Sequence, residues 1–157
     1  MDLNKLVKEF HEKNGFKVDA NLLCENSIEG NVCLQIAASS LASLCDSIKH
    51  NAIKTQAAGD ERTYRFWLMC EELQEAAQAL LVKDEVALAD ACGDLHYVTS
   101  GTMVSYDLPM NETCEEIHRS NMSKQKRTKD NVRMRNKGKD WAPPDLRMVI
   151  DKYRKGK

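Results

Sequence analysis

The sequence is poor in the residues that interrupt helices. Of its 157 residues, 7 are glycine and 3 are proline, about half the share that these two residues take in an average protein. β-Sandwiches and barrels need frequent tight turns between short strands, so this shortage disfavours both architectures. The composition instead favours long helices, and the predicted fold class is an all-α helical bundle, a single domain over residues 1–157.

Long hydrophobic runs are also absent. The longest uninterrupted apolar run has five residues, from Phe66 to Cys70, so we expect neither a transmembrane helix nor a membrane partner. Charged residues such as Asp2 and Lys5 near the N-terminus predict that this end is not a signal peptide. The six cysteines include no closely spaced pair, which favours free thiols in a reducing compartment and therefore a cytoplasmic location.

The net charge is only −1, which excludes a uniformly basic nucleic-acid-binding protein. The charges are nevertheless unevenly distributed. The segment 119–139 holds nine basic residues and one acid, whereas Lys83 is the only basic residue between Phe66 and His118, a stretch with eleven acids. Helix surfaces usually mix the two signs, because Glu–Lys pairs one turn apart are mildly stabilising. A metal ion could supply the missing positive charge.

The spacing of apolar residues predicts six helices. Asn14-Gly15 is expected to end the first helix, and Asn111 is expected to cap the fifth. The segment 123–144 looks irregular and strongly basic. The expected helices are 2–13, 29–57 (with Val32, Ile36, Leu41, Leu44 and Ile48 as its core face), 61–82, 84–106, 111–122 and a short one after Pro144.

Five carboxylates fall on the third and fourth of these helices. At 100° per residue, Glu71, Glu72 and Glu75 cluster on one side of the third helix, and Asp90 and Asp94 share a stripe of the fourth. The short link after Lys83 makes the two helices antiparallel neighbours, so the carboxylates can converge. Such an oxygen-rich site suits Mg²⁺ or Mn²⁺. The alternative is that all five are ordinary surface acids. The expected core-facing residues are Phe66, Met69, Cys70, Leu73, Ala76, Ala77 and Leu80 on the third helix, and Leu88, Ala91, Cys92, Leu95, Val98 and Thr102 on the fourth.

Four sequence motifs occur in an order and spacing that resemble a known family. They are RTYRFWLMCEELQE at 62–75, DACGDLHYVTSG at 90–101, EEIHRSNMSK at 115–124 and KGKDWAPPD at 137–145. The pattern resembles the MazG-like, all-α nucleoside triphosphate pyrophosphohydrolases, relatives of phosphoribosyl-ATP pyrophosphohydrolase and the dimeric dUTPases. The resemblance implies a helical bundle, usually a dimer or tetramer, that cleaves nucleotides between the α and β phosphates.

The resemblance also implies roles for individual residues. Glu72, Glu75 and Asp94 would bind Mg²⁺ or Mn²⁺, and Asp90 would replace a glutamate that relatives carry where this chain has Ala91. Glu71 would be the general base, or it would contact the metal ligands without binding the metal itself. The residues implied in contacts with the substrate are Asn121, Lys124, Lys137 and Trp141.

The predicted function is Mg²⁺-dependent hydrolysis of a nucleoside triphosphate to a monophosphate and pyrophosphate by a homodimer or homotetramer. The predicted biological role is removal of unwanted nucleotides. We also expect the basic segment at about 123–145 to form a lid over the substrate. The alternative is a non-catalytic helical module whose basic segment binds nucleic acid or an acidic partner. Nucleic acid is the less favoured partner, because Trp141 is the only aromatic residue interleaved with the cations.

Overall fold

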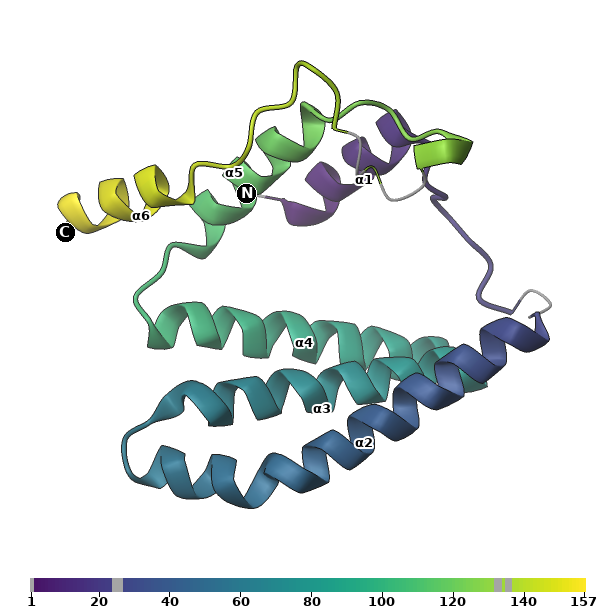
Figure 1. The fold of residues 1–157 in the computed structure, drawn as a ribbon, viewed down its shortest axis with the longest axis vertical. Coiled ribbons are helices and arrows are strands. Elements are labelled where there is room, and N and C mark those ends of the chain that lie inside the picture. Colours follow the sequence, from purple (N-terminus) through teal and green to yellow (C-terminus); the bar gives the residue numbers. More distant parts are fainter. Residues whose placement is uncertain (1, 24–26, 132–133, 135–136) are drawn as a thin grey trace. The chain divides into compact units, whose positions relative to one another are not determined.

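The computed structural model describes residues 2–23, 27–131, 134 and 137–157. Its elements are helices throughout these residues, without a strand, which confirms the all-α prediction. Two compact units divide the chain (Figure 1): one contains residues 21–106, and the other contains residues 1–20 and 107–157. The helices are α1 (Leu3–Asn14), α2 (Ile28–Ala57), α3 (Glu61–Val82), α4 (Glu85–Ser105), α5 (Met110–Met122) and α6 (Leu146–Lys155), with a 3₁₀ turn at Lys129–Asn131.

In the unit 21–106, α3 is the middle helix and packs against both α2 and α4 (Figure 1). Local capping explains where α3 and α4 begin, because Asp60 and Asp84 accept hydrogen bonds from backbone N–H groups of the first turns that have no partner within the helix. Lys83 ends α3 with a left-handed backbone, at φ 60°. The tight link between Val82 and Glu85 makes α3 and α4 neighbours, as the sequence predicted.

The core of this unit is built from small residues around one tryptophan. Trp67 of α3 is 8% exposed and packs with Cys70 against Cys45 and Ala52 of α2. The aliphatic core expected on α2 is only partly correct. Ile48 packs against the core and Leu41 is half-buried, but Val32, Ile36 and Leu44 are exposed. The fully buried positions are Ala38, Cys45 and Ala52. Small side chains at these positions let α2 approach α3 closely, so most of the larger residues remain outside the contact.

The core faces predicted for α3 and α4 are only partly correct. Cys70 and Ala77 are buried as expected, but Phe66 and Leu73 are exposed. Trp67 and Ala79, which the helical wheel left out, are buried. A helix with neighbours on two sides buries two narrow strips and leaves the faces between them open, and the wheel assumed a single broad strip.

The cysteines are free thiols wherever the structure describes them. Cys92, which was expected in the core, is exposed, as is Cys33, whereas Cys45 and Cys70 are buried. Cys24 lies outside the described residues.

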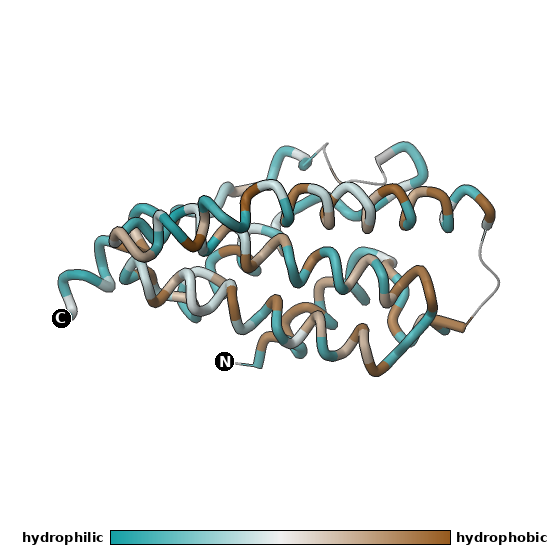
Figure 2. The backbone as a smooth tube through the Cα atoms, turned by 90° about the horizontal axis from the view of Figure 1, so that it is seen from below, coloured by the Kyte–Doolittle hydropathy of each residue, from teal (hydrophilic) through white to brown (hydrophobic). Residues whose placement is uncertain are grey.

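α2 has the length and composition of a membrane span. Its 30 residues contain a window with mean hydropathy 1.2, and 11% of that window is buried. Figure 2 shows hydrophobic positions interleaved with hydrophilic ones along the long helices. The expectation of no spanning segment considered only uninterrupted apolar runs, and α2 meets the length and average-hydropathy test without one. Core helices of soluble proteins pass the same test.

In the other unit, α1 packs against α5. Asp2 caps the start of α1, and Gly15 ends the helix in the left-handed region at φ 70°, as Asn14-Gly15 predicted. The aromatic rings of Phe10 and Phe16 stack with centroids 5.8 Å apart. This contact folds the chain back on α1 after its last turn.

The junction between α5 and α6 is held by Glu116 of α5. Its carboxylate accepts two hydrogen bonds from Arg119, each 2.7 Å long, and one from the backbone N–H of Asp145 at 2.7 Å. Arg119 also donates to the carbonyl of Pro143 at 2.9 Å. The predicted cap at Asn111 is wrong, because α5 already begins at Met110 after Pro109. Proline lacks an N–H group and readily precedes a first helical turn.

Candidate functional site

α3 and α4 bring the predicted carboxylates into electrostatic contact. Burial raises the pKa of Glu72, and the negative charges of Glu75, Asp94, Glu71 and Asp90 raise it further. Two of these neighbours belong to α3 and two to α4. The charges of both helices therefore act on Glu72, whereas the roles predicted for these carboxylates stay predictions.

Glu71 lies on the part of α3 that faces α2. Burial raises the pKa of its carboxyl, while the positive charge of Lys49 on α2 lowers it and Glu75 raises it again. Glu71 therefore interacts with α2, and Glu72 interacts with α4. The acidic groups extend across the middle helix from one neighbour to the other.

The carboxylates and the exposed apolar residues occupy opposite faces of α3. Glu71 and Glu75 are four residues apart and share one face, whereas Phe66 and Leu73 are seven residues apart and share another. At 100° per residue, the second face points about 180° away from the first. The unit thus has an acidic side, which we define by Glu71, Glu72, Glu75, Asp90 and Asp94.

The acidic side offers the ligand type that magnesium prefers, since its donors are carboxylate oxygens and include neither histidine nor cysteine. Among the residues that the structure describes, no group of three or more potential ligands is already arranged around one metal position. Like charges that crowd together in the apo state are nevertheless the electrostatic situation that a bound cation relieves.

The residues predicted to contact substrate all belong to the other unit. Asn121 of α5 lines a groove of about 120 Å³ between α1 and α5, together with Leu6, Phe10 and His118. Lys124 and Lys137 line a second pocket, of about 350 Å³. Of the nine basic residues at 119–139, Lys124, Lys137 and Lys139 line this one pocket. Arg133 and Arg135 lie outside the described residues.

The backbone of two loop segments builds this lysine-lined pocket. The N–H of Gln125 donates to the carbonyl of Lys137 at 3.0 Å. Gly138 has φ +79°, and a Cβ at this position would lie 3.1 Å from Cβ of Gln125. The Nζ atom of Lys137 stands 3.7 Å from the centre of the Trp141 ring, a cation–π contact that fixes the ammonium group. The predicted residues Lys124, Lys137 and Trp141 are therefore neighbours.

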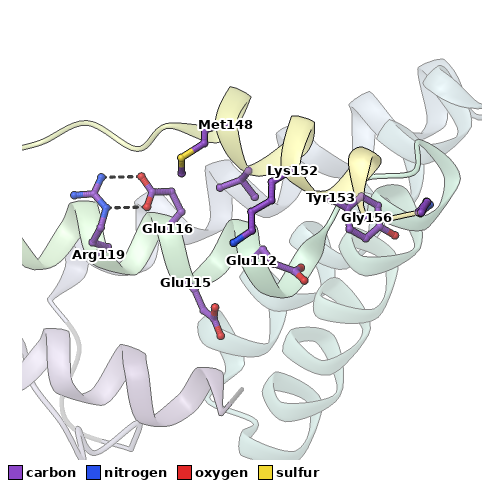
Figure 3. A pocket seen from close by; sticks show the side chains of 10 residues that line it. Glu112, Glu115, Glu116, Arg119, Met148, Lys152, Tyr153 and Gly156 are labelled. Atoms are coloured by element: carbon purple, nitrogen blue, oxygen red, sulfur yellow. Dashed lines mark hydrogen bonds and ion pairs between the residues drawn. The ribbon is translucent and has the colours of Figure 1, made fainter.

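The sequence did not indicate a groove of about 630 Å³ between α5 and α6. Figure 3 shows the carboxylates of Glu112, Glu115 and Glu116 on the α5 side and Met148, Lys152 and Tyr153 on the α6 side. The amphipathic pattern of α6 could have indicated that one of its faces packs near another helix, but the sequence analysis predicted only a short helix after Pro144. In the groove, Glu116 is already engaged by Arg119 (Figure 3).

Residues 44–121 match the family model described as phosphoribosyl-ATP pyrophosphohydrolase. The match agrees with the resemblance to the MazG-like, all-α nucleoside triphosphate pyrophosphohydrolases that the four sequence motifs indicate. No curated protein and no solved structure matches the chain significantly. The pyrophosphohydrolase region contains the C-terminal part of α2, all of α3 and α4, and most of α5, and so includes all five residues of the acidic side.

The match supports a hydrolase that acts on a nucleotide-like substrate. It ends at Asn121, so the lysine-lined pocket and α6 follow the matched region. Roles for these later residues depend on the geometry described above.

Proposed function

We propose that this pyrophosphohydrolase cleaves nucleoside triphosphates between the α and β phosphates, in a Mg²⁺-dependent reaction that yields a monophosphate and pyrophosphate. The observation that carries the proposal is that the negative charges of Glu71, Glu75, Asp90 and Asp94 act on Glu72 and raise its pKa, within the region matched to the family. A triphosphate cannot approach bare carboxylates without a cation between the two sets of negative charges.

Glu72, Glu75, Asp90 and Asp94 would hold the metal ion, and Mn²⁺ would fit the same oxygen donors. A bound divalent cation supplies charge neutralisation and polarisation of a phosphoryl oxygen. Glu71 is the residue that we assign to accept a proton from the attacking water, since burial raises the pKa of its carboxyl and so makes it a stronger base.

The lysine-lined pocket supports a binding site for the phosphates or sugar. Lys124 and Lys137 present ammonium groups, and Lys137 is fixed over the Trp141 ring. Asn121, in the groove between α1 and α5, supplies an amide that can donate and accept hydrogen bonds. The segment at about 123–145 would close over the substrate as a lid, because bound phosphates offset the mutual repulsion of its cations.

The exposed apolar residues support assembly into a homodimer or homotetramer. Phe66 and Leu73 of α3 are 50% and 44% exposed, and on α2 Ile36 is 61% exposed. Exposed large apolar residues of this kind are typical of surfaces that pack against a partner. We retain a single functional domain, a cytoplasmic location and removal of unwanted nucleotides as further parts of the proposal.

The deciding experiment identifies the products. Purified protein with Mg²⁺ is incubated with each of a panel of natural and modified nucleoside triphosphates, and the products are separated by anion-exchange chromatography. We expect a monophosphate and pyrophosphate in equal amounts. Formation of a diphosphate and orthophosphate would show cleavage between the β and γ phosphates and would contradict the proposal.

The second candidate function is a non-catalytic helical module, which the clustered lysines at 124, 137 and 139 favour. Absence of turnover across the whole panel, together with salt-sensitive binding of an acidic polymer such as heparin, would favour this module over the enzyme.

A further inference from the structure

Two cations that the sequence analysis did not single out belong to the helices around the acidic side: Lys49, whose charge acts on Glu71, and Arg65, which lies beside Gly101 of α4. The sequence between Phe66 and His118 provides only Lys83 as a basic residue, so the stretches of α3 and α4 that carry the five carboxylates contain no cation of their own apart from this link residue. The structure brings in Lys49 from α2 and Arg65 from the first part of α3. Both belong to the unit 21–106, which also contains the five carboxylates.

Lys49 is positioned by Trp67. Its Nζ atom lies 5.6 Å from the centre of the indole ring, and Trp67 is 8% exposed and held in the core of the unit. Glu71 follows Trp67 by four residues and so lies one turn further along the same face of α3. The ammonium group of Lys49 is therefore beside the acidic side, where its charge acts on Glu71.

Arg65 is positioned by Gly101 of α4. The guanidinium Nη1 atom lies 3.1 Å from the place that a Cβ of residue 101 would occupy, so any larger residue at 101 would require the guanidinium to shift by a few tenths of an ångström. Glu61 holds Nε of Arg65 at 3.2 Å from one end. Gly101 follows Asp94 by seven residues and shares its face of α4, and Glu72 follows Arg65 by seven residues on α3.

We propose that Lys49 and Arg65 bind the phosphate chain of the substrate at the acidic side, one from each edge of α3. The inference rests on the proposed triphosphate hydrolysis. It assigns phosphate binding to Lys49, which lies outside the four motifs, and to Arg65, which lies in the first motif but was given no role there. One divalent cation neutralises only two of the five carboxylate charges, and the phosphate chain adds further negative charge. Two fixed cations at the edges reduce the remaining repulsion, and the guanidinium of Arg65 can donate two parallel hydrogen bonds to one phosphate.

The chain offers a matched control for each residue. Lys54 is also exposed on α2, five residues after Lys49. Arg62 precedes Arg65 by three residues on α3, and its side chain is 80% exposed and paired with Asp60. Each of four variants removes one cation. Lys49→Met and its control Lys54→Met change α2, and Arg65→Met and its control Arg62→Met change α3. Methionine keeps an apolar stem of similar length, so the packing of Lys49 on Trp67 is largely retained.

The test measures binding by calorimetry with Mg²⁺ and the α,β-methylene analogues of dATP, dCTP, dGTP and dTTP, each used separately. For an analogue that wild type binds, we expect Lys49→Met and Arg65→Met to weaken binding about tenfold, or about 1.4 kcal/mol. Lys54→Met and Arg62→Met should bind within about twofold of wild type, and the matching monophosphate should be affected less than the triphosphate analogue. Lys49→Arg should recover most of the lost affinity, whereas Arg65→Lys should recover only the part due to charge, because lysine cannot donate two parallel hydrogen bonds.

Gly101→Ala tests the position of Arg65 without changing any charge. The added methyl group would displace the guanidinium, so binding should weaken, and the double variant with Arg65→Met should lose no more than Arg65→Met alone. If wild type, Lys49→Met and Arg65→Met bind the analogue equally, the assignment of Lys49 and Arg65 is overturned. The proposed function is nevertheless upheld in that case if wild type hydrolyses the triphosphate. Loss of binding that the conservative variants do not recover also overturns it. Wild type that neither binds nor hydrolyses any nucleotide overturns both.

Discussion

Replacing Glu72 by glutamine should stabilise the metal-free protein and abolish its response to magnesium. In the apo state, burial and four neighbouring carboxylates disfavour the charged form of Glu72. A group whose pKa is raised by folding destabilises the folded state once the pH exceeds its ordinary value. Glutamine has nearly the same helix propensity and shape but carries no charge, so the substitution removes this repulsion at neutral pH.

The size of the effect follows from the number of neighbours. A like-charged pair one turn apart on a helix costs about 0.2–0.5 kcal/mol. Glu75 is the one such neighbour of Glu72 on α3, and Glu71, Asp90 and Asp94 add further repulsion. Together they suggest a gain of about 1 kcal/mol for Glu72→Gln. That gain corresponds to a rise in Tm of about 4 °C for a cooperative unit of this size.

Magnesium should raise the Tm of wild type but not that of Glu72→Gln. A ligand at a concentration one hundred times its Kd stabilises a protein by about 2.7 kcal/mol, so wild type should gain Tm on addition of Mg²⁺ and Glu72→Gln should not. Thermal denaturation followed by circular dichroism, with and without Mg²⁺, gives both numbers. Asp46→Asn, a neutralised exposed acid on α2, serves as the control and should respond to Mg²⁺ like wild type. A lower apo Tm for Glu72→Gln, combined with a normal Mg²⁺ response, would refute the assignment of Glu72.

Further predictions address the core, the acid response and the lysine-lined pocket. Trp67→Ala should lower the free energy of unfolding by about 3–5 kcal/mol, measured from urea denaturation, because Trp67 is the only large residue among the buried members of its cluster in the described structure. Arg119 and the N–H of Asp145 lower the pKa of Glu116 to about 2. The stabilisation from Glu116 is therefore present above its ordinary pKa and lost as the pH falls toward 2, and Glu116→Gln should flatten the acid limb of a stability–pH curve. Asp90→Asn should lose most of the Mg²⁺-dependent rise in Tm, and an unchanged rise would remove Asp90 from the ligand set. Lys137→Ala should raise KM, and nucleotide with Mg²⁺ should slow tryptic cleavage within 123–145; equal cleavage with and without nucleotide would argue against a lid. Gly138→Ala forces a side chain onto Gln125 at a positive φ, so it should raise KM through distortion of the same pocket.

Helix positions were predictable because their signals are local. The scarcity of glycine and proline, the Asn14-Gly15 stop and the break at Lys83 each act on a few neighbouring residues. The start of α5 was misplaced by this reasoning, since Asn111 is a good capping residue but Pro109 already ends the preceding segment.

The composition of the core was less predictable. A helical wheel distributes residues around one helix but does not say how many neighbours the helix has. α3 has two neighbours, so Trp67 and Ala79 are buried while Phe66 and Leu73 are exposed. On α2, small residues at 38, 45 and 52 are the buried positions, and of the larger aliphatic residues predicted as a core face Ile48 packs against them while Val32, Ile36 and Leu44 are exposed.

The sequence by itself determined the helical class, the antiparallel order of α3 and α4, and the identity of the carboxylates, because spacing along one helix and a short link are sufficient for these conclusions. Only the tertiary structure decided which cations accompany those carboxylates. Lys49 is separated from Glu71 by an entire helix–helix connection, and the guanidinium of Arg65 lies against Gly101 of the neighbouring helix α4. Contacts of this kind depend on how closely helices approach one another, which the packing of small residues between α2, α3 and α4 sets and which no local pattern encodes.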